Sequence, residues 1–327
     1  MNFSKRLKRL EERQNPNYKS YSLESSFSAI HESVENEFVK AKEYVKRAME
    51  ELPKRSTDIS YEEGNRVKTH LLEELPNYGF RPDFEYQGSV PCNTHIKYHS
   101  DIDLLVIIDK FETFENANRI THRYLGNPIE DLINLRAACI KILKENYTVA
   151  DIEKNSKSIT ISGGSLRRHI DVIPANWYNT ENWYIYNQDH YRGIQVFDNK
   201  TEERDKNFPF LNIHLINEKD NQTCGKYRPL VRLAKTLKED SEYDINISSY
   251  DIQALLYNMK NSNFFSNIND ILIYTADYLS NLIQDPNKYF SLIVPDETRR
   301  IADKVDIKEI KKLYDEFYEL SIKLRII

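Results

Sequence analysis

Hydrophobic and polar positions follow two periods along this chain, one typical of helices and one of strands. Residues 22–52 carry apolar side chains at steps of three or four and end before a proline, which predicts a long amphipathic helix. A second helix is expected over residues 61–75, and Asn127-Pro128 begins a third by the cap-then-proline signature. From about Phe210 onward the helical period dominates, and it predicts helices at 227–239, 249–260, 268–284 and 306–324.

Strand-like segments lie in the first two thirds of the chain. The run from Leu104 to Ile108 is rich in branched apolar residues, which is typical of a buried strand. Side chains alternate along a strand, so Asp101 and Asp103 are expected on the same face. Further short strands are expected at 148–152, 158–162, 169–173 and 194–197.

This order of elements predicts an α+β protein with two domains. The boundary is expected between residues 200 and 210, where the pattern changes from mixed to helical. Residues 1–205 would form N-terminal helices with a lobe built on a mixed sheet, and residues 206–327 would form a helical lobe. A chain of 327 residues is long enough for two such cores.

Composition excludes several classes of protein. The 46 Lys and Arg residues and 51 Asp and Glu residues give a formal net charge of −5, which is not the balance of a general nucleic-acid coat. The three cysteines are far apart and form no zinc-binding pairs, as expected in a reducing cytoplasm. No apolar run approaches the roughly 18 residues of a membrane span. A soluble cytoplasmic protein is expected.

Three aspartates suggest the chemistry. Asp171 lies in the expected strand 169–173, and if that strand pairs beside the one after Asp101, then Asp101, Asp103 and Asp171 converge at one end of a sheet. Such a cluster of carboxylates requires cations, and oxygen ligands suit Mg²⁺, with Mn²⁺ as an alternative. Two metal ions held together would support in-line nucleotidyl transfer with pyrophosphate as the leaving group. The other interpretations are a solvated strand start for the first two residues and a structural role for Asp171.

Gly88-Ser89 precedes these aspartates and suggests a phosphate site. A glycine after a strand lets backbone N–H groups approach a phosphate, and the Ser89 hydroxyl adds a donor. Ser89 could instead cap a helix, a role with compatible geometry. Arg167 and Arg168 would either steady a nucleotide phosphate or offset the carboxylates.

These motifs resemble a known superfamily. Gly88-Ser89, eleven intervening residues, Asp101-Ile102-Asp103 and a later strand aspartate look like the signature of the DNA polymerase beta nucleotidyltransferases. The stretches "FPFLNIHLINEKDNQTCGKYRPLVRLAKTLKED" and "ISSYDIQALLY" narrow the resemblance to the cGAS/DncV-like nucleotidyltransferases of bacterial anti-phage (CBASS) systems. The resemblance covers roughly residues 30–290.

The resemblance implies a two-lobed enzyme with its active site in the cleft between the lobes. It implies synthesis of a cyclic di- or trinucleotide second messenger from NTPs through 2'-5' or 3'-5' bonds, with release of pyrophosphate. The product would be read by a downstream effector in anti-phage defence. No nucleic-acid activator is evident, because the zinc-binding insertion of the animal sensor is missing from the sequence.

The resemblance also assigns roles to residues. Asp101, Asp103 and Asp171 would bind Mg²⁺, and Asp171 would help to deprotonate the attacking ribose hydroxyl. Gly88 and Ser89 would contact the triphosphate.

In the helical lobe, Lys235 and Ser249 look like residues that reach the same phosphates, and Tyr250 like an aromatic that stacks on a base. Lys235 could equally be a surface lysine, and Tyr250 a packing residue in a chain with 22 tyrosines.

Other functions remain open on the sequence alone. The enzyme could transfer a nucleotide to an RNA end, a protein or a small molecule, or make a linear 2'-5' oligonucleotide. A nucleotide-binding sensor with an inactive site is disfavoured by the intact set of three aspartates, and a general RNA-binding module by the net charge.

Overall fold

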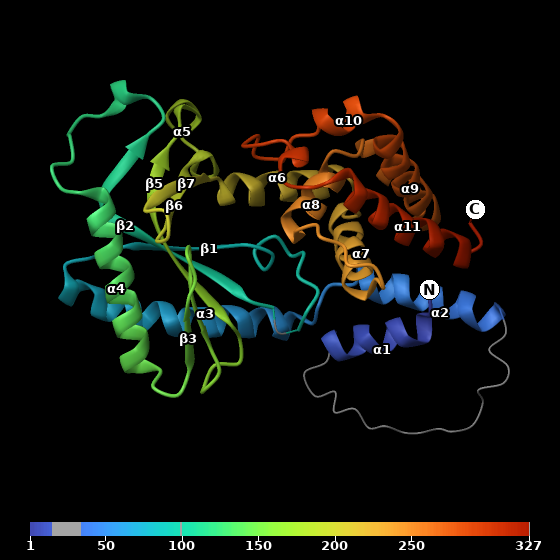
Figure 1. The fold of residues 1–327 in the computed structure, drawn as a ribbon, viewed down its shortest axis with the longest axis horizontal. Coiled ribbons are helices and arrows are strands. Elements are labelled where there is room, and N and C mark those ends of the chain that lie inside the picture. Colours follow the sequence, from blue (N-terminus) through green and yellow to red (C-terminus); the bar gives the residue numbers. More distant parts are fainter. Residues whose placement is uncertain (15–33, 99, 327) are drawn as a thin grey trace. The chain divides into compact units, whose positions relative to one another are not determined.

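A computed structural model describes residues 1–14, 34–98 and 100–326 of the chain. Its contacts form two compact units, whose elements are labelled in Figure 1. The sheet unit consists of Pro53–Asn93 and His99–Leu215. The helical unit consists of Met1–Leu52, Thr94–Tyr98 and Ile216–Ile327.

The sheet unit is built on one seven-stranded sheet. Its strands are β1 (Asp83–Gln87), β2 (Ile102–Phe114), β3 (Asp151–Lys154), β4 (Ile159–Ser162), β5 (Ile170–Asn179), β6 (Gly193–Asp198) and β7 (Glu203–Asn207). The order is β1-β2-β5-β4-β3, and β6 pairs with both β5 and β7. Only the β2–β5 pair is parallel among these described strands, and the five other pairs are antiparallel. The expected mixed sheet is therefore present.

Two helices cover one face of this sheet. Helices α3 (Lys54–Glu74) and α4 (Pro128–Asn146) bury their apolar stripes against it. The even-numbered residues of β2 and β5 face these helices, namely Ile102, Leu104, Val106, Ile108, Ile170 and Val172. The odd-numbered apolar residues belong to a second cluster with Phe210 of α6 (Pro209–Gln222), namely Leu105, Ile107, Ile173, Ala175 and Trp177. Since Asp103 and Asp171 are also odd-numbered, they share the face that α3 and α4 do not cover.

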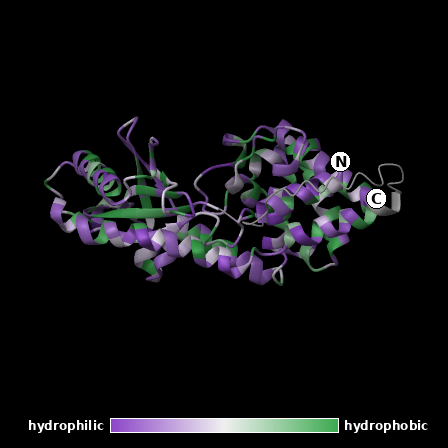
Figure 2. Ribbon diagram, turned by 90° about the horizontal axis from the view of Figure 1, so that it is seen from below, coloured by the Kyte–Doolittle hydropathy of each residue, from purple (hydrophilic) through white to green (hydrophobic). Residues whose placement is uncertain are grey.

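Short elements connect the strands of the sheet unit. They are η1 (Leu75–Tyr78), η2 (Ala117–Arg119), α5 (Glu181–Tyr186) and η3 (Asp189–Tyr191). In Figure 2 the longest strand in view is green, the colour of hydrophobic residues, whereas the helices are banded green and purple. The central strands β2 and β5 are mainly apolar and buried, while β1, β3 and β7 are largely polar and exposed or half-buried, as expected of a sheet with a buried centre and amphipathic helices on one face.

The helical unit gathers both ends of the chain. Its helices are α1 (Phe3–Gln14), α2 (Val34–Met49), α7 (Tyr227–Asp240), α8 (Ser249–Tyr257), α9 (Ile268–Gln284), α10 (Pro286–Ser291) and α11 (Ile307–Lys323), with η4 (Asn261–Phe264), η5 (Ile301–Asp303) and the end of α6. Buried ion pairs hold α1: Arg13 contacts Asp240 of α7 at 2.5 Å, and Arg6 contacts Glu316 of α11 at 2.7 Å. Across the part of the chain that the structure describes, no helix has the length and apolar character needed to cross a membrane.

Most expected elements are confirmed. Helix α4 begins at Pro128, as expected. The Asn127 side chain is its N-cap and accepts hydrogen bonds from the backbone N–H groups of Ile129 and Glu130. Helix α9 has the expected bounds, while α8 ends three residues early, at Tyr257. The strand expected at 148–152 lies instead at Asp151–Lys154.

Three further expectations concern the first long helix, the fold class and the domain boundary. The helix expected at 22–52 corresponds to α2 from Val34 onward, and its earlier part lies outside the described residues. The α+β class is confirmed. The division into domains at 1–205 and 206–327 stays a prediction.

Candidate active site

The strand pairing brings two of the three predicted aspartates side by side. Strands β2 and β5 are parallel, and Asp103 is the register partner of Asp171. Neighbouring strands lie about 4.8 Å apart, so the two carboxylates share one small area of the uncovered face. Asp101 directly precedes β2, two residues before Asp103, and is exposed. The pairing on which the carboxylate hypothesis depended is therefore present.

The protonation of Asp103 reflects this crowding. Burial raises its pKa to about 7, and the charges of Asp171 and then Asp101 add to the rise. Both causes act against the charged form of the carboxyl group. A nearby cation would reverse this effect, because it favours the ionised carboxylate.

Neighbouring side chains position the other two carboxylates. The hydroxyl of Thr160, the β4 partner of Asp171, donates a short hydrogen bond to Oδ1 of that carboxylate. Asn155 in turn donates to the Thr160 hydroxyl at 2.9 Å. Asp101, just before β2, has the exposed ring of His169 beside it, with Nδ1 of His169 lying 3.6 Å from Oδ1 of Asp101. Thr160 is not among the residues predicted from the sequence, because an alternating strand pattern does not show which carboxylate a strand threonine will face.

Gly88 contacts the same site through its backbone. It follows β1 with φ +89°, and a Cβ built there would lie 2.1 Å from Oδ2 of Asp103. A side chain is thus excluded both by the backbone conformation and by the carboxylate. Ser89 begins a turn that is closed by the hydrogen bond from Asn93 N to Val90 O at 3.0 Å. No helix begins there, so capping of a helix by Ser89 is not observed.

The donor set fits divalent cations. Asp103 and Asp171 lie in register with Asp101 two residues away, and burial followed by the charges of Asp171 and Asp101 raises the pKa of Asp103. Among the described residues, no group of three or more His, Cys, Asp or Glu side chains is arranged so that it could hold a metal ion by itself. Oxygen ligands from substrate phosphates commonly complete such sites. Asp101, Asp103 and Asp171 would hold the ions together with a nucleotide.

The two arginines that precede β5 have a structural role. Arg168 is buried and donates to the Ser60 hydroxyl at 3.2 Å, while Arg167 pairs with Glu63 at 2.7 Å. Both partners lie on α3. These contacts attach the start of β5, and hence Asp171, to the helix beneath the sheet.

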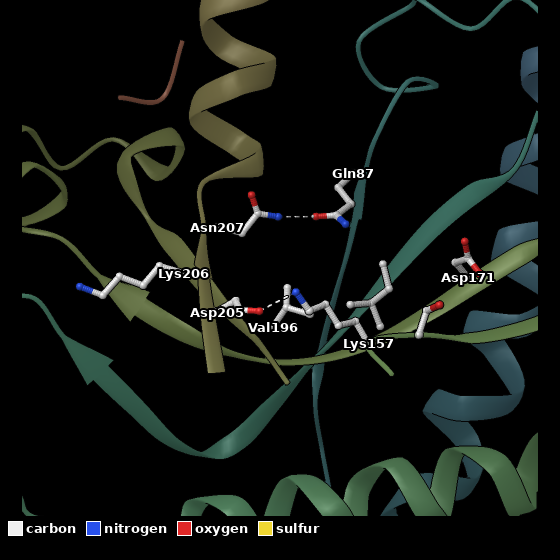
Figure 3. Close-up of a pocket in the computed structure, with 9 residues that line it drawn as sticks. Gln87, Lys157, Asp171, Val196, Asp205, Lys206 and Asn207 are labelled. Atoms are coloured by element: carbon white, nitrogen blue, oxygen red, sulfur yellow. Dashed lines mark hydrogen bonds and ion pairs between the residues drawn. The ribbon is translucent and has the colours of Figure 1, made fainter. Parts of the chain in front are cut away.

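A pocket of about 360 Å³ lies beside Asp171 on the uncovered face (Figure 3). This volume is within the range of small-molecule sites. Ile173 and Val196 form its apolar lining. Its polar lining consists of Gln87, Lys157, Ser158, Asp171, Asp205, Lys206 and Asn207. Figure 3 shows two interactions across it, an ion pair between Lys157 and Asp205 at 2.5 Å and a hydrogen bond from Asn207 to Gln87 at 3.2 Å.

The predicted helical-lobe residues lie in the helical unit. Lys235 is buried on α7, and its ammonium group donates to the backbone carbonyl of Thr94 at 2.6 Å. Ser249 is the exposed first residue of α8, and Ser248 before it is the N-cap. Exposed N–H groups at a helix start are suited to a phosphate.

Tyr250 is partly buried and already has polar partners. Its hydroxyl donates to Asp296 at 3.0 Å, and the Arg299 guanidinium lies 5.5 Å from its ring. Burial and then the Asp296 charge raise the pKa of this phenol. Its role as a base platform stays a prediction.

Comparison with known proteins decides the family. Residues 214–321 match the family model described as the cGAS/DncV-like nucleotidyltransferase C-terminal helical domain. Cyclic dinucleotide synthase CdnE of Yersinia aleksiciae is 35% identical over 271 residues, 80% of this chain and 70% of that protein. A c-di-GMP synthase of Capnocytophaga granulosa is 33% identical over 340 residues, 95% of this chain and 94% of that protein.

The chain belongs to the cGAS/DncV-like nucleotidyltransferase family. It is therefore a nucleotidyltransferase, as the aspartate motif predicted.

Solved structures of this family share the fold over nearly the whole chain. The STING-associated CdnE c-di-GMP synthase from Capnocytophaga granulosa superposes with a TM-score of 0.80 at 31% identity, covering 99% of both chains. The corresponding synthase from Flavobacteriaceae sp. gives a TM-score of 0.82 at 26% identity, covering 99% of this chain and 98% of the other. The polymerase beta-like fold expected from the sequence is confirmed.

Proposed function

We propose that this nucleotidyltransferase joins two molecules of GTP into cyclic di-GMP and releases two molecules of pyrophosphate. The observation that carries the proposal is the register alignment of Asp103 with Asp171, with Asp101 two residues away. Similarity to synthases named for c-di-GMP supports guanine as the base.

Each bond is made by the same displacement. A ribose hydroxyl oxygen of one nucleotide attacks the α-phosphorus of the other, and the bond to pyrophosphate breaks. A second such step closes the ring. Divalent cations, when bound by the three aspartates, supply charge neutralisation for the phosphates.

Residues of the protein would orient the reacting groups and accept the proton. The Thr160 hydroxyl donates to the carboxylate of Asp171 and orients it, and this carboxylate would accept the proton of the attacking hydroxyl. The backbone at Gly88 and the turn at Ser89 lie beside Asp103, where they can bind the triphosphate.

The pocket beside Asp171 suits a purine base. Ile173 and Val196 offer an apolar surface to its faces, and Asp205 supplies acceptors for the N–H donors of a guanine edge. The product would be read by an effector that binds cyclic nucleotides, as the STING-associated relatives suggest, within a defence system of the CBASS type.

Product analysis tests this proposal. The protein is incubated with Mg²⁺ and each NTP, alone and in mixtures, and the products are identified by mass spectrometry. GTP alone should yield a phosphatase-resistant cyclic dinucleotide. A product that forms only when an RNA, protein or small-molecule acceptor is added would overturn the proposal in favour of transfer to that acceptor.

A double variant tests the residues. Asp101→Asn combined with Asp103→Asn should abolish pyrophosphate release without unfolding the protein, because it removes charge and little volume. Asp109→Asn is the matched control, since Asp109 is exposed farther along β2 and should be dispensable. Unaltered turnover in the double variant would exclude the metal assignment.

A further inference from the structure

A buried arginine of α4 holds the loop between β3 and β4, residues 155–158, which we call the β3–β4 loop. Arg136 is only 4% exposed, and its Nη2 atom donates to two backbone carbonyls of this loop. It makes a short hydrogen bond to the carbonyl of Asn155 and one of 3.1 Å to the carbonyl of Ser158. One nitrogen atom therefore fixes both ends of the loop to a helix that covers the sheet.

The charge of this guanidinium is not balanced by a carboxylate. Among the described residues Arg136 forms no ion pair, and its Nη1 atom has no hydrogen-bond partner. Burial lowers the pKa of Arg136, because it disfavours the charged form. A buried charge without a counter-ion destabilises a folded protein. Stability alone therefore does not account for an arginine at this position.

The β3–β4 loop connects Arg136 to the carboxylate of Asp171. The Asn155 amide donates to the Thr160 hydroxyl at 2.9 Å, and that hydroxyl donates a short hydrogen bond to Oδ1 of Asp171. A hydroxyl carries one proton and two lone pairs. Because the amide occupies a lone pair, the proton of Thr160 is directed to Asp171, and hydrogen bonds in such a chain reinforce one another. The arginine thus holds the backbone of the residue that begins this chain.

The middle of the loop is held independently of the arginine. The Asn199 N–H donates to the Ser156 carbonyl at 2.8 Å, and Lys157 pairs with Asp205 at 2.5 Å (Figure 3). Lys157 and Asp205 line the pocket beside Asp171. This part of the pocket wall should therefore remain in place when the arginine is replaced.

We propose that Arg136 is a positioning residue for nucleotidyl transfer, which holds the β3–β4 loop so that Asn155 and Thr160 orient the aspartate of β5. This inference deepens the proposed function and rests on it for its kinetic consequence. Every residue in this chain of contacts belongs to the sheet unit. Because Arg136 acts only through other residues, its loss should change the rate of the reaction more than the binding of GTP.

Two substitutions at Arg136 separate its hydrogen bonds from its volume. Arg136→Met removes the donor, whereas Arg136→Lys retains it, since both bonds come from one nitrogen atom and an ammonium group has three N–H donors. Lys141→Met is the matched control on the same helix, because Lys141 is exposed and contacts the Tyr78 ring. Hydrogen exchange of residues 151–162 is measured without nucleotide, and pyrophosphate release from GTP gives kcat and KM.

We expect Arg136→Met to accelerate exchange in the β3–β4 loop by at least about threefold. It should lower kcat by about tenfold to 100-fold, the usual effect of a misplaced catalytic group, while KM for GTP changes by less than about threefold. Arg136→Lys should keep exchange and kcat close to those of the wild type, and Lys141→Met should change neither. Equal effects of the two Arg136 substitutions, or a raised KM with unchanged kcat, would overturn the proposal.

A double-variant cycle tests the route from the loop to Asp171. Thr160→Val removes the hydroxyl with little change of shape and should lower kcat by itself. If Arg136 acts through Thr160, adding Arg136→Met to Thr160→Val should lower kcat no further. Additive losses would mean that the arginine acts by another route, and they would overturn the proposal.

A variant at an exposed position covers the case in which Arg136→Met does not fold. Asn155→Ala removes the amide donor to Thr160 without opening the core, and Asn146→Ala, which removes a donor to Glu74, is its control. Asn155→Ala should lower kcat by about tenfold with little change in KM, and an unchanged kcat would overturn the proposal. If the wild type releases no pyrophosphate from GTP, the proposed function fails, while the exchange comparison still decides whether Arg136 holds the loop.

Discussion

At the scale of single residues, Asp103 is the group on which the site depends most. It lies between two other carboxylates on a partly buried strand, and its pKa is raised to about 7. A protein without a functional reason would rarely keep such an arrangement, because it destabilises the ionised form. A divalent cation would relieve this repulsion, which is why we propose that the site binds one.

Metal affinity should therefore depend on pH. Mn²⁺ or Mg²⁺ must displace the proton of Asp103, so affinity should fall about tenfold from pH 8 to pH 6 when the pKa is near 7. Titration calorimetry of the nucleotide-free protein at both pH values measures this change. Equal affinity at the two pH values would mean that Asp103 is not a ligand.

The raised pKa of Asp103 should also make the stability of the metal-free protein depend on pH. The folded pKa of Asp103 lies above the unfolded value of about 3.9, so the folded state binds the proton more tightly and stability falls as pH rises from about 4 to 7. Asp103→Asn should accordingly be more stable than the wild type at pH 8, by up to about 4 kcal/mol for a shift of about three pKa units, and lose this advantage near pH 4. Chemical denaturation at the two pH values provides the measurement.

At the scale of elements, the end of β1 shapes the site as much as the aspartates do. Gln87, the last residue of β1, is the register partner of Asp103, and the chain then turns at Gly88 over that carboxylate. The turn both ends the strand and brings the backbone at Gly88 beside the Asp103 carboxylate, which we propose as a metal ligand.

Alanine substitutions at two glycines with similar backbone conformations distinguish the cost of backbone strain from the effect of contact with Asp103. Gly88 and Gly79 have φ of +89° and +78°, but a Cβ at Gly79 would meet no atom within 4 Å. Gly79→Ala should cost about 1 kcal/mol of stability and leave turnover unchanged. Gly88→Ala should cost as much and also lower turnover by at least about tenfold, because its methyl group displaces Asp103. Equal turnover in the two variants would show that the approach to Asp103 is unimportant.

At the scale of the whole molecule, the N-terminal helices belong to the helical unit. Phe3 and Leu10 of α1 are fully buried in it, and the Asp240 carboxylate is fully buried between Arg13 and the Tyr44 hydroxyl. The N-terminal helix is therefore part of the same core as the C-terminal helices.

Breaking the buried pair should be costly. Arg13→Met leaves the charge of Asp240 without its guanidinium partner and should lower the free energy of unfolding by about 3 kcal/mol or more. Lys288→Met removes an exposed pair with Asp285 and should change it by less than about 1 kcal/mol. Guanidinium chloride denaturation compares the two, and similar small losses would show that α1 contributes little to the helical unit.

Local pattern was sufficient for most of the elements and for the family. The apolar run after Asp103 predicted β2, and the Asn127-Pro128 signature predicted the start of α4, because both depend on neighbouring residues alone. The spacing of Gly88, Asp101 and Asp103 predicted the superfamily for the same reason.

Only the tertiary structure decided which distant residues meet. The parallel register of Asp103 with Asp171, the bond from Thr160 to Asp171 and the burial of Lys235 against Thr94 each join segments far apart in the chain. Periodicity shows which face a side chain takes but not what packs against that face. For this reason the sequence could make the meeting of the aspartates only conditional on a strand pairing, and it left Lys235 as either a phosphate contact or a surface lysine. The fold placed Asp103 in register with Asp171 and buried Lys235 against the Thr94 carbonyl.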